Sequence, residues 1–329
     1  MMKTKILTLL REQKDYVSGQ QLCEQFGVSR TAVWKAIGQL RKEGYDIEAI
    51  SNKGYRLREA TNAEIYSKSE IASRIQTRWA GNKVYFYDEI GSTNVEAKRL
   101  AEAGAPHGTL VVADMQTAGR GRRGRSWISP AGTNIYFTIL LKPEFAPDQA
   151  SMLTLVIAHA ITKVFRDTLG LAAGIKWPND VVIDGRKTCG ILTEMSLEQN
   201  DIQYVVIGVG INVRKQEFAP EIAERAIALD EVSARPVDRS RLLADVMSRF
   251  EKDYETFLRT CSMASLQDSY NGMLVNLDRE VCVLDPAGEY RGIARGINER
   301  GELIVELKDK SLRNVYAGEV SVRGVYGYV

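Results

Sequence analysis

The stretch from Gln116 to Trp127 is the feature that most constrains the fold and chemistry of this chain. It reads Gln-Thr-Ala-Gly-Arg-Gly-Arg-Arg-Gly-Arg-Ser-Trp, so three glycines and four arginines precede a tryptophan. Glycine lets a backbone approach a ligand closely and adopt a positive φ. Arginine presents a planar, permanently charged group that suits phosphate or carboxylate. The stretch therefore predicts a loop that closes over an anionic small molecule.

The same letters satisfy Gly-x-Gly-x-x-Gly, a dinucleotide-binding pattern that requires a strand before the loop and a helix after it. Residues 109–113 do indicate an entering strand. Residues 134–141 are β-branched and aromatic without a helical period, so a second strand is expected there. The dinucleotide interpretation is therefore rejected. A solvated basic loop or an RNA-binding arginine–glycine tract stays open from this stretch alone.

The bulk properties exclude several classes of protein. The chain has 329 residues, enough for two or three domains, and a formal net charge of only +2. Any affinity for nucleic acid must therefore come from a local basic patch. The four cysteines are scattered, without the spacing of a zinc site or a disulfide framework. No apolar run is long enough to span a bilayer and a signal-peptide pattern is lacking, so we expect a cytoplasmic protein.

The first sixty residues have the order of a DNA-binding domain. Apolar residues at helical spacing predict three helices, the second capped by Ser18 and the third by Ser29, followed by a hairpin with a basic tip. Residues 1–60 contain 11 Lys and Arg against 7 Asp and Glu, a net charge of +4 in an almost neutral chain. The segment resembles the winged helix–turn–helix of bacterial repressors. A helical protein-interaction domain is the alternative.

The candidate DNA contacts lie at helix starts and at the hairpin tip. The exposed side of the third helix, near its N-terminal end, is where a recognition helix reaches bases and phosphates. One such unit makes few phosphate contacts, and affinity depends on their number, so operator binding would need a dimer. The predicted contacts are Ser18, Ser29, Arg30, Thr31, Trp34, Lys35 and Lys53.

Four further stretches have polar side chains that a simple connection does not need. They are Gly91-Ser-Thr-Asn94, Lys176-Trp-Pro-Asn-Asp180, Lys187-Thr-Cys-Gly-Ile-Leu192 and Gly208-Val-Gly-Ile-Asn212. The first starts a predicted helix, where free backbone N–H groups hold polar ligand groups. A lysine that enters an apolar strand is costly to bury unless it meets an anion. Plain N-capping, a lysine that reaches solvent and a simple β-turn are the alternatives for the first, third and fourth stretches.

Helices and short strands are expected around these stretches. Apolar periodicity predicts helices over residues 61–77, 149–169 and 220–258. His159 lies on an apolar helix face and is interpreted as a core histidine. After Leu277, five short β segments separated by turns suggest a small barrel.

Gln116, the arginine–glycine loop and the four stretches occur in the order and spacing of a known family. The chain resembles the bifunctional biotin protein ligases and biotin operon repressors over residues 80–215, and its flanking regions match as well. The resemblance implies an α+β multidomain protein of three parts. These are a winged helix–turn–helix over 1–62, a mixed α/β core of the biotin/lipoate ligase type over 63–275 and a Src-homology-like β barrel over 276–329.

The resemblance also implies roles for single residues. Biotin would be bound by Ser92, Thr93, Asn94, Gln116, Gly119, Arg120, Gly121, Arg122 and Lys187. ATP or the adenylate would be bound by Arg120, Arg122, Trp127, Lys176, Asn179, Lys187 and Asn212. Arg122 and Lys187 would be catalytic because fixed cations help two anions to meet. Asp180 would orient or deprotonate the acceptor lysine. No protein-bound metal is expected beyond the Mg²⁺ that accompanies ATP.

The function implied is a ligation in two steps combined with repression. Biotin and Mg-ATP would give biotinyl-5′-adenylate, and biotin would then pass to a lysine of the biotin carboxyl carrier protein. With the adenylate as corepressor, a homodimer would bind operator DNA of biotin synthesis or transport genes. A biotin-sensing regulator without ligase activity and a lipoate-type acyl-carrier ligase are the alternatives.

Overall fold

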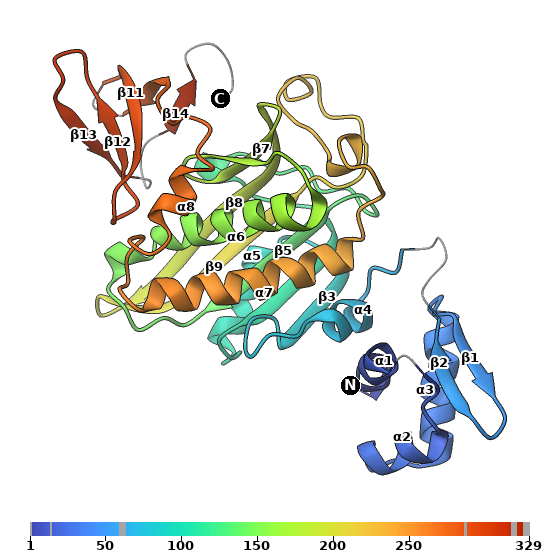
Figure 1. Cartoon of the computed structure of the whole chain (residues 1–329). Coiled ribbons are helices and arrows are strands. Elements are labelled where there is room, and N and C mark those ends of the chain that lie inside the picture. Colours follow the sequence, from blue (N-terminus) through green and yellow to red (C-terminus); the bar gives the residue numbers. More distant parts are fainter. Residues whose placement is uncertain (1, 14, 59–63, 286–287, 317–320, 325–329) are drawn as a thin grey trace. The chain divides into compact units, whose positions relative to one another are not determined.

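The computed structural model describes residues 2–13, 15–58, 64–285, 288–316 and 321–324, the last segment by its backbone alone. The chain forms two compact units (Figure 1), residues 1–76 with 238–244 and residues 77–237 with 245–329. The predicted boundary at residue 62 lies outside the described residues. The predicted boundary at residue 275 lies within the larger unit, so the three-domain division remains a prediction.

The smaller unit contains the predicted three helices and hairpin. Its elements are α1 (Met2–Glu12), α2 (Gly19–Phe26), α3 (Arg30–Lys42), β1 (Ile47–Ile50) and β2 (Gly54–Leu57). Ser18 and Ser29 cap α2 and α3, because their hydroxyl oxygens accept hydrogen bonds from the backbone N–H groups of Gln21 and Ala32. The helix starts predicted from these two serines are confirmed.

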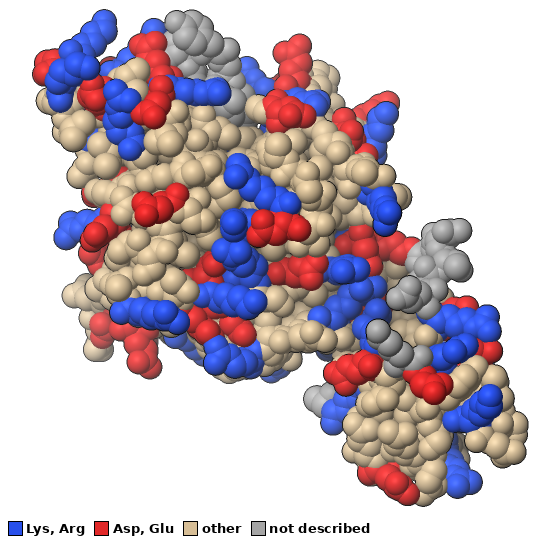
Figure 2. All heavy atoms as spheres, viewed as in Figure 1, with Lys and Arg blue, Asp and Glu red and all other residues tan. Residues whose placement is uncertain are grey.

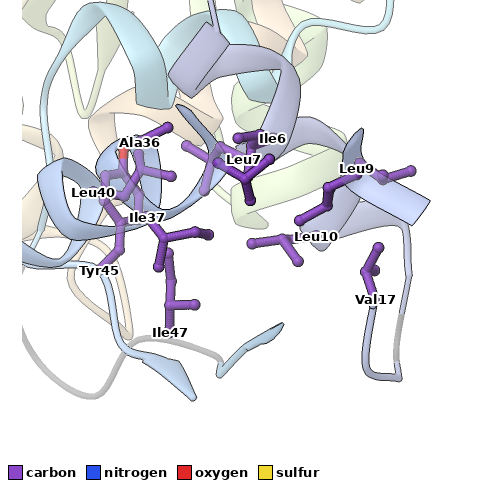
Figure 3. Close-up of a cluster of buried hydrophobic side chains, with 12 residues drawn as sticks. Ile6, Leu7, Leu9, Leu10, Val17, Ala36, Ile37, Leu40, Tyr45 and Ile47 are labelled. Carbon is purple, nitrogen blue, oxygen red and sulfur yellow. The ribbon is translucent and has the colours of Figure 1, made fainter. Parts of the chain in front are cut away.

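A single apolar cluster holds this unit together (Figure 3). Leu7 and Leu10 of α1 meet Ile37 and Leu40 of α3, and all four are at most 2% exposed. Ile47 brings the hairpin into the same cluster. The buried positions of α3 recur at helical spacing, so its opposite side is left to solvent.

Helix α4 (Lys68–Arg74) is shorter than the helix predicted over residues 61–77. It begins after its cap, Ser67, and has ended by Ile75, whose backbone is extended. Residues 61–63 of the predicted span lie outside the described residues. Within the helix, the buried Glu70 carboxylate accepts from Arg11 of α1 at 2.7 Å and from Arg74 at 2.6 Å.

The larger unit is built on a seven-stranded mixed sheet. Its strands are β3 (Lys83–Ile90), β4 (Thr109–Gln116), β5 (Ile135–Leu141), β6 (Gly174–Lys176), β7 (Asp180–Ile183), β8 (Arg186–Glu198) and β9 (Asp201–Ile211). Their order is β3-β4-β5-β9-β8-β7-β6, with β3 parallel to β4 and the other neighbours antiparallel. The arginine–glycine loop joins β4 to β5, which confirms the predicted strand–loop–strand context.

Helices cover the sheet on both sides. Val111, Leu140 and Val206 pack against α5 (Thr93–Glu102) on one face. Helices α6 (Met152–Leu169) and α7 (Arg239–Leu258) lie over the other face (Figure 1). His159 of α6 is fully buried and lies 2.7 Å from the Asp253 carboxylate of α7, so it is the core histidine predicted.

The helix predicted over residues 220–258 is wrong in its first half. Helix α7 begins only at Arg239, and the preceding chain holds turns and one short 3₁₀ turn, Leu229–Glu231. Backbone groups of this stretch pair with the core: Lys187 N–H donates to Arg225 O, and Leu229 N–H donates to Asn212 O. These partners replace the hydrogen bonds that a helix would have made.

The C-terminal part is a second, smaller sheet. Its strands are β10 (Glu280–Leu284), β11 (Tyr290–Ile297), β12 (Leu303–Glu306), β13 (Leu312–Val315) and β14 (Ser321–Gly324), paired antiparallel in the order β13-β12-β11-β10-β14. The five β segments predicted after Leu277 are confirmed. The short helix α8 (Gln267–Asn271) precedes this sheet. Among the described residues, no helix is long and apolar enough to cross a membrane.

Candidate functional site

A cleft lies where the start of α5, the arginine–glycine loop and the middle strands of the sheet meet. Its free volume is about 50 Å³. The lining residues are Ser92, Thr93, Asn94, Gln116, Arg120, Gly121, Arg122, Trp127, Asn179, Lys187, Gly190, Ile191, Leu192, Gly208, Val209 and Gly210. All five motifs therefore contribute to one site.

The start of α5 presents polar groups to this cleft. Ser92 is the residue before the helix, yet its hydroxyl makes no capping hydrogen bond, which removes the plain N-cap interpretation for this serine. Thr93 donates its backbone N–H to Gln116 Oε1 at 2.9 Å, and its hydroxyl lies 3.1 Å from the same oxygen. Gln116 Nε2 donates to Ser129 Oγ at 3.0 Å. The end of β4 thus fixes the helix start beside the loop.

Three glycines leave the α5 side of the sheet bare beneath the cleft. Asn94 lies directly on Gly208, where an added Cβ would come within 2.0 Å of Asn94 Oδ1. The indole of Trp127 lies on Gly190 and Gly210, with 2.5 Å between its Nε1 and a Cβ built on Gly210. A side chain at any of these positions would have to displace Asn94 or Trp127. Close approach, rather than a simple β-turn, explains these glycines.

Two cations, Arg122 and Lys187, also line the cleft, and each has a polar partner. Arg122 donates to Asn179 Oδ1 at 2.9 Å, and Lys187 Nζ lies 2.6 Å from Asp180 Oδ1. The same ammonium is 5.2 Å from the centre of the Trp127 ring. Burial lowers the pKa of the Arg122 guanidinium, partly offset by Asp180. Lys187 therefore meets an anion and an aromatic face, as a lysine in an apolar strand requires.

Most of the predicted ligand-binding residues meet in this cleft, and four do not line it. Gly119 lies beside it, as its carbonyl accepts from the Trp127 N–H. Asp180 reaches it through Lys187. Lys176 and Asn212 are each 6% exposed, at the end of β6 and just beyond β9. The ligand-binding and catalytic roles of all the predicted site residues, these four included, remain predictions.

Three residues of the site were not predicted. Thr138 of β5 is fully buried, with its hydroxyl 2.8 Å from that of Thr93 and 2.6 Å from Asn94 Oδ1. Glu194 of β8 accepts from Asn94 Nδ2 at 2.7 Å. Ser129 is the third, and its hydroxyl oxygen accepts a hydrogen bond from Gln116 Nε2. Glu194 lies within a strand pattern and gives no sequence signal, whereas Thr138, a threonine in the otherwise apolar and aromatic run of β5, was a usable one.

A second, larger cavity of about 320 Å³ adjoins the cleft. Arg122 and Asn179 line both spaces, so their hydrogen bond lies in the wall between them. Glu194 lines the larger cavity but not the cleft.

The smaller unit exposes the predicted recognition face. Arg30, Thr31, Trp34 and Lys35 of α3 are all exposed, and Trp34 is exposed to 68%. Lys53 is exposed in the turn between β1 and β2. Figure 2 shows Lys and Arg side chains gathered over this hairpin, whereas charges of both signs alternate over the larger unit in the same view. The hydroxyls of Ser18 and Ser29 already serve as helix caps.

The fold and the cleft together define a class of protein: an α/β core with a cleft that contains cations, in one chain with a winged helix–turn–helix. Comparison with known families agrees. Residues 88–212 match the biotin/lipoate A/B protein ligase family, residues 3–56 match an HTH domain, and residues 277–323 match the biotin protein ligase C terminal domain.

Known proteins narrow the class to one family. The chain is 36% identical to the bifunctional ligase/repressor BirA of Bacillus subtilis over 310 residues, 94% of each protein. It is 32% identical to that of Escherichia coli over 321 residues, 97% of this chain and 96% of the relative. The biotin protein ligase of Aquifex aeolicus, solved in complex with biotin and ATP, superposes with a TM-score of 0.64 at 31% identity, covering 74% of this chain and 99% of that one. The chain belongs to the family of bifunctional biotin ligase/repressors.

Proposed function

We propose that this chain is an ATP-dependent biotin protein ligase that also represses transcription, with biotinyl-5′-adenylate as intermediate and corepressor. The main support is the cleft itself. It brings Arg122 and Lys187 into one cleft with the helix start of α5, in a chain that resembles a bifunctional ligase/repressor along 94% of its length. Because of these substrates and the DNA partner, the proposed location of the protein is the cytoplasm.

In the first step the biotin carboxylate oxygen attacks the α-phosphorus of ATP, and the bond to pyrophosphate breaks. Two anions must approach, so fixed cations in a site with little water give the main assistance. Arg122 and Lys187 supply them. Trp127 and the buried Asn212 are the proposed adenine contacts. Mg²⁺ is proposed to arrive with the nucleotide.

In the second step a lysine amine of the carrier protein attacks the mixed anhydride, and AMP leaves. The amine must be neutral to attack. Asp180 is proposed to position the amine or take its proton. Since Asp180 contacts Lys187 at 2.6 Å, Lys187 must move toward the ligand before this carboxylate serves the acceptor.

Labelling of a carrier domain tests the ligase function. The chain is incubated with Mg-ATP and a biotin carboxyl carrier domain, with biotin in one sample and lipoate in another, and the carrier is weighed by mass spectrometry. We expect the carrier to gain the mass of one biotinyl group in the sample with biotin and to stay unlabelled in the sample with lipoate. An unlabelled carrier would contradict ligase activity, and labelling with lipoate alone would contradict the proposed substrate.

The exposed face of α3 and the β1–β2 hairpin are the proposed operator contacts. Replacing Lys35 with alanine is expected to lower the slope of log affinity against log salt by about 1, because one phosphate contact is lost. Titration of a mixed-sequence duplex at several salt concentrations measures this slope. Lys5, exposed on α1, provides the control: Lys5→Ala should leave the slope unchanged. An unaltered slope for Lys35→Ala would remove α3 from the DNA interface.

Repression is proposed to depend on a ligand-linked dimer. Adenylate bound in the cleft would order residues 116–127, and the ordered surface would pair two chains so that two winged helices meet two half-sites. Sedimentation of the chain with and without biotin plus Mg-ATP measures this linkage. We expect tighter dimerisation with both ligands, and equal dimerisation constants would contradict the proposal.

A further inference from the structure

Hydrogen bonds run without a break across the cleft wall, from β8 to the start of α5. Lys98 donates to Glu194 Oε1 at 2.6 Å, and Asn94 Nδ2 donates to Glu194 Oε2 at 2.7 Å. Asn94 Oδ1 lies 2.6 Å from the Thr138 hydroxyl, which lies 2.8 Å from the Thr93 hydroxyl. Glu194 is the carboxylate in this series of hydrogen bonds. Its side chain is 26% exposed and does not line the cleft.

The direction of these hydrogen bonds follows from the carboxylate at the end. A carboxylate only accepts, so the amide nitrogen of Asn94 must face Glu194, and the amide oxygen must face Thr138. That oxygen has no hydrogen, so the single hydroxyl hydrogen of Thr138 goes to it. The Thr93 hydroxyl then donates to Thr138 Oγ1 or to Gln116 Oε1. In either case the Thr93 oxygen receives no hydrogen from Thr138 or Gln116.

We propose that Glu194 is a positioning residue for biotin, because its charge orients the Asn94 amide and leaves the Thr93 oxygen as a hydrogen-bond acceptor toward the ligand. The matching ligand group is a ring N–H of a cyclic urea. This inference rests on the proposed biotin-binding role of the cleft and adds Glu194 as the residue that orients its α5 side. Thr93, which lines the cleft, would make the contact.

Two further observations support an ionised Glu194. Burial raises the pKa of its carboxyl, but the hydrogen bonds from Asn94 and Lys98 outweigh this effect, and the pKa lies below its usual range. The other acceptor near Asn94 Nδ2 is the Leu192 carbonyl at 3.4 Å, which is near the limit of a hydrogen bond. Glu194 is therefore the dominant control on the orientation of the Asn94 amide.

The variant Glu194→Gln should reverse the direction of these hydrogen bonds. In Glu194→Gln, the Lys98 ammonium requires the amide oxygen of the new side chain, so the new NH₂ group faces Asn94. The Asn94 amide must then turn over and donate to Thr138, and the Thr138 hydrogen moves to the Thr93 oxygen, where it occupies one of the two lone pairs offered to the ligand. We expect biotin affinity, measured by calorimetry without ATP, to fall about tenfold, the value of one misdirected hydrogen bond.

Removing the lysine should undo this loss. In the double variant Lys98→Met with Glu194→Gln, the glutamine is free to turn its oxygen to Asn94, so biotin affinity should return to within about twofold of wild type. Lys98→Met alone keeps the carboxylate and should bind biotin like wild type. Thermal unfolding of all four proteins checks that each is folded. A purely structural role for Glu194 predicts no rescue.

The outcomes separate this inference from the proposed function. Equal biotin affinity in wild type and Glu194→Gln, or a double variant no better than Glu194→Gln, would overturn the role of Glu194 while biotin binding stands. A wild type that binds no biotin would overturn the proposed function together with this role. Loss in Glu194→Gln with rescue in the double variant supports both.

Discussion

Replacing Lys187 with methionine is expected to slow formation of the acyl adenylate by about 10²- to 10³-fold. The ammonium lies at the cleft, 2.6 Å from Asp180 and over the Trp127 ring, where it can reach both a carboxylate and the phosphate under attack. Methionine keeps the length of the side chain and removes the charge. Pyrophosphate release under single-turnover conditions, with saturating biotin and Mg-ATP, measures the step.

A neighbouring basic residue provides the control for this experiment. Arg186 precedes Lys187 on β8 and does not line the cleft, so Arg186→Met should retain the wild-type rate. If Lys187→Met released pyrophosphate as fast as Arg186→Met, the cation at position 187 would have no part in the chemistry.

Replacing Arg122 with glycine is expected to speed loss of the bound adenylate by roughly 10- to 100-fold, because one or two charge-assisted hydrogen bonds disappear. Arg122 is the loop arginine that donates to Asn179, in the wall between the two cavities. Its removal opens this wall without disturbing the sheet, so the unit should remain folded. The rate is measured by trapping released adenylate after rapid dilution.

The loop offers a matched variant one residue further on. Arg123 is exposed and has a left-handed backbone, φ 57°, which glycine adopts without strain. Arg123→Gly therefore removes an equal charge from the same loop and should retain the adenylate like wild type. Equal retention by Arg122→Gly and Arg123→Gly would contradict the role given to Arg122.

The sequence predicts those parts of this protein that depend on neighbours along the chain. Ser18 and Ser29 mark helix starts because a hydroxyl oxygen reaches a backbone N–H three residues away. The apolar, β-branched run after the arginine–glycine loop predicts a strand because it lacks helical period. The cleft residues were predicted through the spacing of whole motifs and the family resemblance rather than from single side chains.

The remainder depends on partners that are distant in the sequence. Thr138 becomes part of the site because the sheet register sets it opposite Gly208, on which Asn94 lies. Glu194 reaches Asn94 across 100 residues of chain. The failed helix over residues 220–238 has the same origin, since its backbone groups pair with Lys187 and Asn212. Helix propensity depends on the residues of the segment itself, so it does not include competing hydrogen bonds to distant strands.

The most direct test of the account is to mix the chain with biotin and Mg-ATP in the absence of any carrier, and to measure pyrophosphate and bound nucleotide over time. We expect a burst of about one pyrophosphate per chain, followed by slow turnover, with the acyl adenylate retained on the protein. Addition of a carrier domain should then discharge it as AMP. Absence of pyrophosphate, or its steady release without any retained acyl adenylate, would contradict a cleft built to make and hold this intermediate.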